Sequence, residues 1–364
     1  MGPLSGIRII EVLGIGPGPF AGMMLADMGA EVIIIDRPGP PSFTDFPIDI
    51  NRRGKRSIAL DLKSSEGKEI FLKLCKTADG LFEGYRPGTM EKLGLGPNDV
   101  AARNEKLVYG RMTGWGQTGP LAKTAGHDIN YIALSGALHA MGPANAPPTV
   151  PLNLVGDYGG GGMMLAFGMV CAILEARTSG KGQTVDVSMV EGSSAMMSLF
   201  YSLKASGLWN GERSANMLNG SAHFYGTYET LDGKYVSLGS VELQFIQIFI
   251  EKAGLDQSWL SNHLNTDKWP ALKTELAALF KTKTSAEWQA LLDGTDACFA
   301  PILSAEEAHA HPHNIERESF IEIDGVTQPA PTPKFSRTKP EVKHAQQKKG
   351  TATANILQEL GLTD

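Results

Sequence analysis

Short apolar runs alternate with amphipathic stretches over the first 115 residues of the chain. The apolar runs have the length of buried strands and cover residues 7–13, 31–36, 80–85 and 106–114. The amphipathic stretches have helical periodicity and cover residues 19–30 and 64–78, the latter with Ser64 or Ser65 as its N-cap. A helix between two strands allows them to run parallel in one sheet. We therefore expect an α/β fold with a doubly wound parallel sheet.

The pattern changes beyond Asp157. A long apolar helix is predicted over 159–182, then a strand over 183–189 and a helix over 190–207. Alternation around Asp232 and Gly233 predicts a hairpin over 224–240. Helical stretches follow at 241–254, 268–282 and 285–293.

These patterns divide the chain into a large α/β domain and a smaller α+β domain. The expected divisions are a large domain over 1–205, a linker rich in glycine and asparagine over 206–223, a small domain over 224–325, and a segment over 326–364. This last segment is rich in proline at first, and its final helix is expected to return to the large domain.

Composition narrows the class of protein. The chain has 364 residues and a net charge of −6, so nucleic acid is not an expected partner. Its three cysteines lie far apart without metal-ligand spacing, which argues against disulfides and zinc and favours a reducing, cytoplasmic location. The N-terminus lacks a signal-peptide pattern. No uninterrupted apolar run of about 18 residues predicts a membrane span.

The turn after the first predicted strand, "GIGPGP" at residues 14–19, resembles part of a dinucleotide-binding fingerprint. That fingerprint requires a third glycine where this chain has Pro19, although Asp36 stands where an acidic residue is needed. A tight turn from strand to helix therefore explains the segment better than NAD binding does.

Basic residues gather between positions 51 and 63 and at the ends of neighbouring strands. They are Arg37, Arg52, Arg53, Lys55, Arg56, Lys63 and Arg86. The carboxyl ends of the strands face the ligand in a doubly wound sheet, and guanidinium groups suit phosphate oxygens. A solvated basic loop is the alternative. The convergence of three segments favours a phosphorylated ligand.

The segment "AGHDINY" at residues 125–131 places a histidine and an aspartate at the start of a predicted helix. Asp128 is the expected N-cap, because its carboxylate can accept from backbone N–H groups of the first turn. His127 then lies just outside the helix, where the dipole favours a neutral imidazole that can act as a base. A purely structural histidine is the alternative.

A second acidic residue, Asp157, precedes the four glycines Gly159–Gly162 at the expected start of the long helix. Each glycine costs a helix about 1 kcal/mol relative to alanine, so a bare backbone is needed here for close packing or for a ligand. Free N–H groups at this helix start can stabilise an oxyanion. Helix capping by Asp157 is the alternative.

Many separate motifs together resemble the 2-methylacyl-CoA racemases of the family III CoA-transferase superfamily. They run in order from about residue 3 to about residue 337 and include "GRMTGWGQTGP", "GHDINYIALSG", "PLNLVGDYGGGG", "SGKGQTVDVSMVEG" and "ERESFIEIDG". The resemblance implies a homodimer of interlocked protomers with large α/β and small α+β domains. It also implies an isomerase that interconverts (R)- and (S)-2-methylacyl-CoA thioesters by 1,1-proton transfer through an enolate.

The resemblance also implies roles for single residues. His127 and Asp157 match the two catalytic bases, and Glu242 matches a carboxylate of the small domain that orients the histidine. The expected coenzyme A contacts are Arg37, Leu60, Asp61, Leu62, Lys63, Tyr85, Arg86, Gly126, Asp128, Ile129, Asn130 and Tyr131. Coenzyme A is part of the substrate, and no metal or other cofactor is expected.

Transferases of the same superfamily are the alternative. They carry an aromatic residue in place of the histidine and use the equivalent of Asp157 as a covalent nucleophile. His127 therefore distinguishes the two activities. The segment "NGSAHFY" at 219–225 and Leu243 depart from the usual family sequences. The acyl chain stays open between a branched fatty acid, a bile-acid-type side chain and an aryl-propionyl group.

Overall fold

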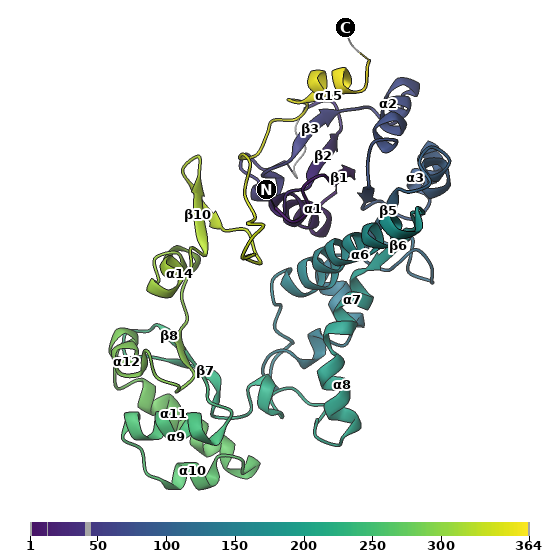
Figure 1. The fold of residues 1–364 in the computed structure, drawn as a ribbon. Coiled ribbons are helices and arrows are strands. Elements are labelled where there is room, and N and C mark those ends of the chain that lie inside the picture. Colours follow the sequence, from purple (N-terminus) through teal and green to yellow (C-terminus); the bar gives the residue numbers. More distant parts are fainter. Residues whose placement is uncertain (1, 13, 41–44, 363–364) are drawn as a thin grey trace. The chain divides into compact units, whose positions relative to one another are not determined.

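The computed structural model describes residues 2–12, 14–40 and 45–362, and the chain divides into two compact units (Figure 1). Unit 1 consists of residues 1–137, 151–198 and 318–364, and unit 2 of residues 138–150 and 199–317. The division differs from the expected domains at 138–150 and 199–205, which lie in unit 2, and at 318–325, which lie in unit 1.

Unit 1 is built on a six-stranded sheet with the order β3-β2-β1-β4-β5-β6, in which all neighbours are parallel. Its strands are β1 (Arg8–Val12), β2 (Glu31–Asp36), β3 (Arg56–Ala59), β4 (Gly80–Glu83), β5 (Val108–Thr113) and β6 (Thr184–Ser188). The order reverses between β1 and β4, where doubly wound sheets form their ligand crevice. The predicted doubly wound sheet is confirmed, but β3 lies within the basic segment and was not predicted as a strand.

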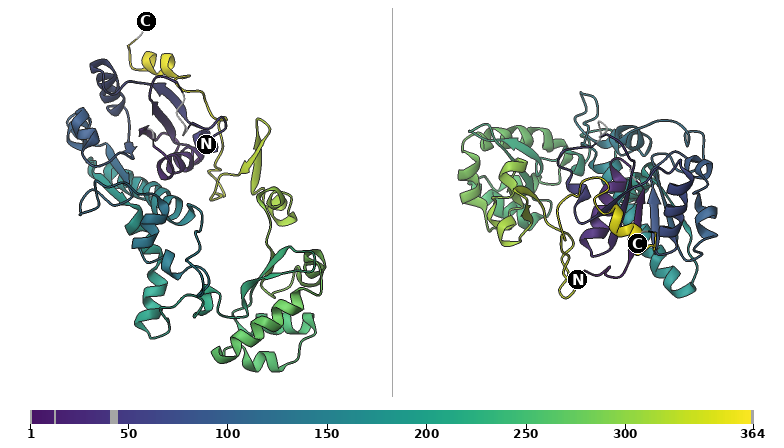
Figure 2. Two further views of the ribbon diagram at one scale, coloured as in Figure 1. Left: turned by 180° about the vertical axis from the view of Figure 1, so that it is seen from behind. Right: turned by 90° about the horizontal axis from the view of Figure 1, so that it is seen from above.

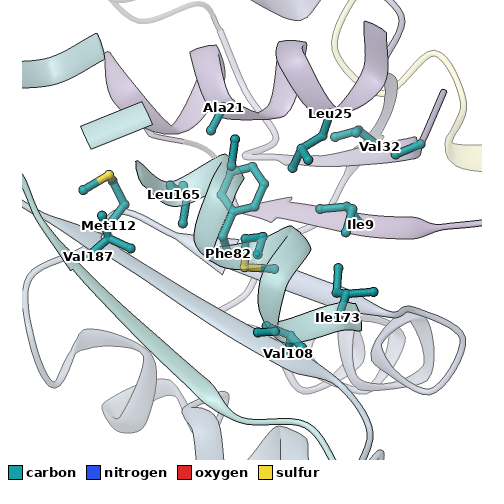
Figure 3. Packing of buried hydrophobic residues seen from close by; sticks show 14 of the residues in the cluster. Ile9, Ala21, Leu25, Val32, Phe82, Val108, Met112, Leu165, Ile173 and Val187 are labelled. Carbon is teal, nitrogen blue, oxygen red and sulfur yellow. The ribbon is translucent and has the colours of Figure 1, made fainter. Parts of the chain in front are cut away.

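Helices cover both faces of this sheet. They are α1 (Pro17–Asp27), α2 (Ser65–Cys75), α3 (Thr89–Leu93), α4 (Pro97–Ala101), α5 (Asp128–Leu134), α6 (Met164–Ser179), α7 (Met189–Met196) and α15 (Thr353–Glu359). Figure 3 shows Leu25 of α1 and Leu165 and Ile173 of α6 packed against Ile9 and Phe82 of the strands. The N-cap of α2 is Ser64, whose hydroxyl accepts from the Gly67 N–H at 2.9 Å.

The C-terminal segment returns to unit 1, as expected. It passes through the hairpin of β10 (Phe320–Ile323) and β11 (Val326–Pro329) and ends in α15, which lies beside β3 (Figures 1 and 2). The Ala352 N–H donates to the Ser57 carbonyl at 2.9 Å, and Ile356 is buried in the same apolar cluster as Ile58.

A π-helical segment, Leu154–Met163, runs directly into α6. The long helix therefore begins before the four glycines, which lie in its interior. A Cβ at Gly160 would lie 2.5 Å from Ser193 Oγ, and one at Gly162 would lie 2.8 Å from the Pro17 carbonyl oxygen. The glycines thus let the segment pack closely against α1 and α7.

The helix Leu154–Ser179 is long and apolar enough to cross a membrane by length and composition alone, although polar residues interrupt its apolar sequence. Half of the most apolar stretch of this helix is buried inside the structure, as in the core helix of a globular protein. Burial on one side leaves the other side of the helix apolar and exposed.

Unit 2 contains a three-stranded antiparallel sheet and short helices. Its elements are β7 (Tyr225–Glu229), β8 (Tyr235–Gly239), β9 (Phe299–Pro301), α8 (Ser198–Ala205), α9 (Leu243–Ala253), α10 (Ser258–Asn262), α11 (Trp269–Phe280), α12 (Ser285–Leu292), α13 (Ala305–Ala308) and α14 (Pro312–Glu316). The predicted hairpin is confirmed, and Gly233 takes a φ of 73° in its turn. The three predicted helices correspond to α9, α11 and α12.

Candidate active site

A cavity of about 1070 Å³ lies in unit 1 at the carboxyl ends of the strands. Residues that follow β1, β2, β4 and β5 line it, among them Ile15, Gly39, Tyr85 and Trp115. This is the edge of the sheet at which the strand order reverses, so the fold places the cavity where a doubly wound protein binds its ligand.

His127 lines this cavity and is exposed at the start of α5. It occupies the N-cap position, and its N–H donates to Asn130 Oδ1 at 3.0 Å. The prediction that Asp128 is the N-cap is therefore wrong. Asp128 is the first residue of the helix, and its Oδ2 instead accepts from the Asp157 N–H at 2.7 Å.

The backbone before His127 is held by two aromatic side chains. The Tyr131 hydroxyl donates to the Gly126 carbonyl, and the Tyr131 ring meets Trp115 edge-on with centroids 4.8 Å apart. A Cβ at Gly126 would lie 2.7 Å from the Tyr131 ring and 2.8 Å from the Trp115 ring. Glycine is needed here because the two rings pack directly on the backbone.

Asp157 lines the same cavity from the π-helical segment and is half-buried. Its Oδ2 accepts from Asn153 Nδ2 at 3.2 Å. Burial raises the pKa of Asp157 and the nearby Asp128 raises it further, while the bond from Asn153 and the charge of His127 oppose the rise. This direction agrees with the expectation that burial makes Asp157 a better proton donor.

The start of α1 faces this carboxylate. A Cβ at Gly16, which has a φ of 72°, would lie 2.8 Å from Asp157 Oδ2. The neighbouring rings of Phe20 and Tyr158 stack with centroids 4.3 Å apart and hold α1 against the π-helical segment. In dinucleotide-binding folds the pyrophosphate binds at this helix start. Here the Asp157 carboxylate lies at that position, which agrees with the interpretation of "GIGPGP" as a tight turn.

The four glycines do not present a helix N-terminus to the cavity. They lie inside the π-helical segment, where backbone N–H groups bond to carbonyls five residues earlier, so the expected oxyanion donors are misplaced. The first turn of α1 offers a single alternative donor, the Gly18 N–H, because Pro17 and Pro19 have no N–H and the next N–H, of Phe20, is already bonded. Gly18 of this turn lines the cavity.

Four of the five cations in the basic segment are paired inside the protein, and the fifth, Lys63, is exposed. The ion pairs are Arg52 with Asp36 at 2.5 Å, Arg53 with Asp27 at 2.6 Å, Lys55 with Glu11 at 2.5 Å, and Arg56 with Glu31 and Glu359. Of these four cations, only Arg52 also lines the cavity. The carboxylates come from β1, α1, β2 and α15, which are distant along the chain from the cations. Sequence spacing could not reveal this pairing.

The expected coenzyme contacts fall into two groups. Tyr85, Arg86, Gly126 and Tyr131 line the cavity with His127 and Asp157. The others do not line it: Arg37, Asp61, Lys63, Ile129 and Asn130 are exposed, Leu62 is half-buried, and Leu60 and Asp128 are buried. Glu242 belongs to unit 2, where it is the exposed N-cap residue of α9, and its expected role stays a prediction.

Four residues of the C-terminal segment, Gln346 to Lys349, also line the cavity and were not predicted. Gln346 Oε1 accepts from the Asp49 N–H at 2.6 Å, and Lys349 Nζ lies 2.6 Å from Asp45 Oδ2. The only signal in the sequence is the polar, basic stretch "QQKKG" after a segment rich in proline.

The sequence and fold of this chain are similar to those of known proteins over nearly its whole length. Residues 4–351 match the family described as CoA-transferase family III. The α-methylacyl-CoA racemases of Mus musculus and Homo sapiens are 44% and 43% identical, each over 99% of this chain and 94% of the relative. The crystal structure of a CAIB/BAIF family protein from Brucella suis has a TM-score of 0.83 at 26% identity and covers 99% of both chains. The chain belongs to CoA-transferase family III.

Proposed function

We propose that the protein interconverts (R)- and (S)-2-methylacyl-CoA thioesters by 1,1-proton transfer. The observation that carries the proposal is the presence of two proton-transfer groups, His127 and Asp157, on the wall of one cavity. The names of the mouse and human relatives point to the same reaction. The presence of His127 favours this reaction over acyl transfer through Asp157.

In one direction, the neutral His127 imidazole removes the α-proton and the thioester carbonyl becomes an enolate. The protonated Asp157 carboxyl then returns a proton to the opposite face of the α-carbon, which inverts the centre. The raised pKa of Asp157 supports this role, because it favours the protonated form that can donate. The reverse direction exchanges the two roles.

The enolate oxygen needs hydrogen-bond donors. The first turn of α1 faces Asp157 and offers one donor, the Gly18 N–H, which has no partner within the helix. Its neighbours Pro17 and Pro19 have no N–H, and the Phe20 N–H bonds to the carbonyl of the N-cap residue. The positive end of the α1 dipole adds to the stabilisation of the developing negative charge.

The coenzyme part of the substrate carries phosphates, and cationic side chains on the cavity wall suit them. Arg86 follows β4, and Lys348 comes from the C-terminal segment and is exposed. A guanidinium or ammonium bonded to phosphate is a strong, charge-assisted pair. We assign Arg86 and Lys348 to the phosphate-bearing end of the substrate.

The exposed side of α6 supports a homodimer. Met163, Phe167, Val170 and Leu174 follow a spacing of three and four residues and therefore share one face of the helix. All four are exposed, Phe167 and Leu174 to 69% each. An exposed apolar stripe of this kind is typical of a surface that a second subunit covers. Phe167→Lys with Leu174→Lys is expected to halve the molar mass in solution, and a monomeric wild type would contradict the assignment.

The proposal is tested with one enantiomer of a 2-methylacyl-CoA in D₂O. Wild-type protein should incorporate deuterium at the α-carbon and lose optical purity together. No exchange and no racemisation across several acyl chains would exclude the reaction. Trapping of an acyl-aspartate with hydroxylamine during turnover would instead identify a transferase that uses Asp157 as nucleophile.

A further inference from the structure

Three side chains of the short helix α5 each bond to backbone at the candidate site. Asn130 accepts from the His127 N–H at 3.0 Å, and Tyr131 donates to the Gly126 carbonyl. Asp128 acts at longer range, because its Oδ2 accepts from the N–H of Asp157, 29 residues later in the chain. Helix α5 thus holds the backbone of both proton-transfer groups.

The contact of Asp128 is enclosed and sterically demanding. The residue is only 7% exposed. A Cβ at Gly156 would lie 2.4 Å from the same Oδ2, so this bond requires glycine at that position. The other oxygen, Oδ1, is buried and has no hydrogen-bond partner among the residues that the structure describes. Burying a carboxylate with so few bonds is unfavourable for stability, which points to a functional reason for retaining it.

Asp128 also acts electrostatically on Asp157. Burial is the main cause of the raised pKa of Asp157, and Asp128 raises it further, while Asn153 and His127 lower it. The pKa of Tyr131, on the same helix, is raised by burial and then by the charge of Asp157. Helices α1 and α7 pack on the π-helical segment, but their acidic residues Asp27 and Glu191 do not contribute to the shift at Asp157.

We propose that Asp128 is a positioning residue, which holds the backbone of Asp157 from the helix that His127 caps and so fixes the separation of the two proton-transfer groups. This inference rests on the proposed racemisation. Inversion needs a base on one face of the α-carbon and an acid on the other, whereas exchange of the α-proton needs only one group. A change in the separation should therefore impair inversion more than exchange.

Two variants separate the bond from the charge. Asp128→Ala removes the acceptor, and we expect inversion to fall by about 10- to 100-fold in kcat with KM little changed. Deuterium incorporation should fall less, so the ratio of exchange to inversion should rise. Asp128→Asn can still accept from the Asp157 N–H but has no charge, so this ratio should stay near that of wild type. Without the charge of Asp128, the pKa of Asp157 should be lower. In the direction in which Asp157 donates the proton, the activity of Asp128→Asn should therefore decline at a lower pH than that of wild type.

Gly156→Ala tests the same contact from the other side, because the added Cβ displaces the Asp128 carboxylate, and it decides the question if Asp128→Ala does not fold. Asp79→Ala is the matched control. Its Oδ2 accepts from the Arg8 N–H at 2.8 Å at the amino end of β1, away from the cavity, so its loss should affect stability alone.

The outcomes distinguish the inference from the proposed function. A wild-type protein that does not racemise refutes the function. A racemising wild type in which Asp128→Ala and Gly156→Ala both retain the wild-type ratio of exchange to inversion overturns the role of Asp128. A raised ratio in either variant, absent from Asp79→Ala, supports it.

Discussion

Each unit contains a titratable side chain whose pKa is shifted by burial, Asp157 in unit 1 and His223 in unit 2, but of these two only Asp157 lines the cavity. In unit 1, burial raises the pKa of Asp157, whose carboxyl faces a cavity large enough for a substrate. In unit 2, burial lowers the pKa of His223 to about 4, and this ring is enclosed by Phe224, Trp259 and His263. Both ring nitrogens of His223 lack a hydrogen-bond partner within the described part of the chain.

A shifted pKa has a different meaning at Asp157 and at His223. Desolvation disfavours the charged form in both places, so the shift alone does not identify a site. Asp157 lines a cavity where it can exchange its proton with a ligand. The His223 ring instead contacts other rings, and its nitrogens have no hydrogen-bond partner among the described residues. We infer that the shift serves the reaction in unit 1 and is a consequence of core packing in unit 2.

The sharpest test of this contrast is Asp157→Asn. The amide cannot transfer the proton, so we expect racemisation to fall by about 10³-fold while the protein remains folded. Asp186→Asn is the control, because the carboxylate of this exposed aspartate likewise accepts one N–H bond of 3.2 Å, here from the Gln117 backbone rather than from the Asn153 side chain. Racemisation by Asp157→Asn at the wild-type rate would remove Asp157 from the mechanism.

Lys55→Met tests whether the buried ion pair beside the cavity stabilises the fold. Glu11 lines the cavity, and Lys55 Nζ lies 2.5 Å from its carboxylate with both groups fully buried. Removing the ammonium leaves Glu11 unpaired, so we expect a loss of about 3–5 kcal/mol in the free energy of unfolding. Arg103→Met, which breaks an exposed pair with Glu69 at 3.6 Å, should cost less than about 1 kcal/mol. Equal losses in the two variants, measured by urea denaturation, would contradict this reading.

His223→Leu tests the core side of the comparison through pH. The folded pKa of His223, about 4, lies below its ordinary value of 6.5, so unfolding takes up a proton between these values. Stability is then fully present above pH 6.5 and is lost as the pH falls towards 4, by at most about 3 kcal/mol. His223→Leu should lessen this dependence. The fluorescence of Trp259 and Trp269 during urea unfolding reports on the surrounding core.

The control for this experiment is His313→Leu, at an exposed histidine of the same unit. It should leave the pH dependence unchanged. If His223→Leu has the same pH dependence as wild type, the proton uptake arises elsewhere in unit 2.

The smallest effect is expected at the cavity rim. Lys348→Ala should raise the KM for the thioester by up to about tenfold, equivalent to about 1.4 kcal/mol, and leave kcat unchanged. Lys343→Ala removes a charge from the same segment at a position that does not line the cavity. An unchanged KM for Lys348→Ala, or a change that persists at high salt, would argue against contact with phosphate.

Much of the sheet could be predicted because buried parallel strands are local apolar runs. Strand β3 was not predicted because its four residues begin with Arg56 and Ser57, which leaves only two apolar residues in the strand. The roles of the cations in this region were also beyond prediction, since their carboxylate partners lie in other elements.

The sequence predicted the two main residues of the candidate site but not the hydrogen bonds between its segments. His127 and Asp157 are conspicuous in the sequence, and the cavity includes both. Capping preference favours Asp128 as the N-cap, but Asn130 bonds to the N-cap backbone and Asp128 bonds to Asp157. Such a choice between competing acceptors depends on tertiary contacts that no local pattern records.

The cavity draws on residues from Glu11 to Lys349, and the last of them come shortly before α15. A chain emerging from the ribosome can therefore form most of the parallel sheet long before its ligand cavity is complete. A chain that stops shortly before residue 346 should lack both this part of the cavity wall and the helix α15 that packs beside β3. Completion of the cavity wall thus depends on a segment that is made after all six strands of the unit 1 sheet.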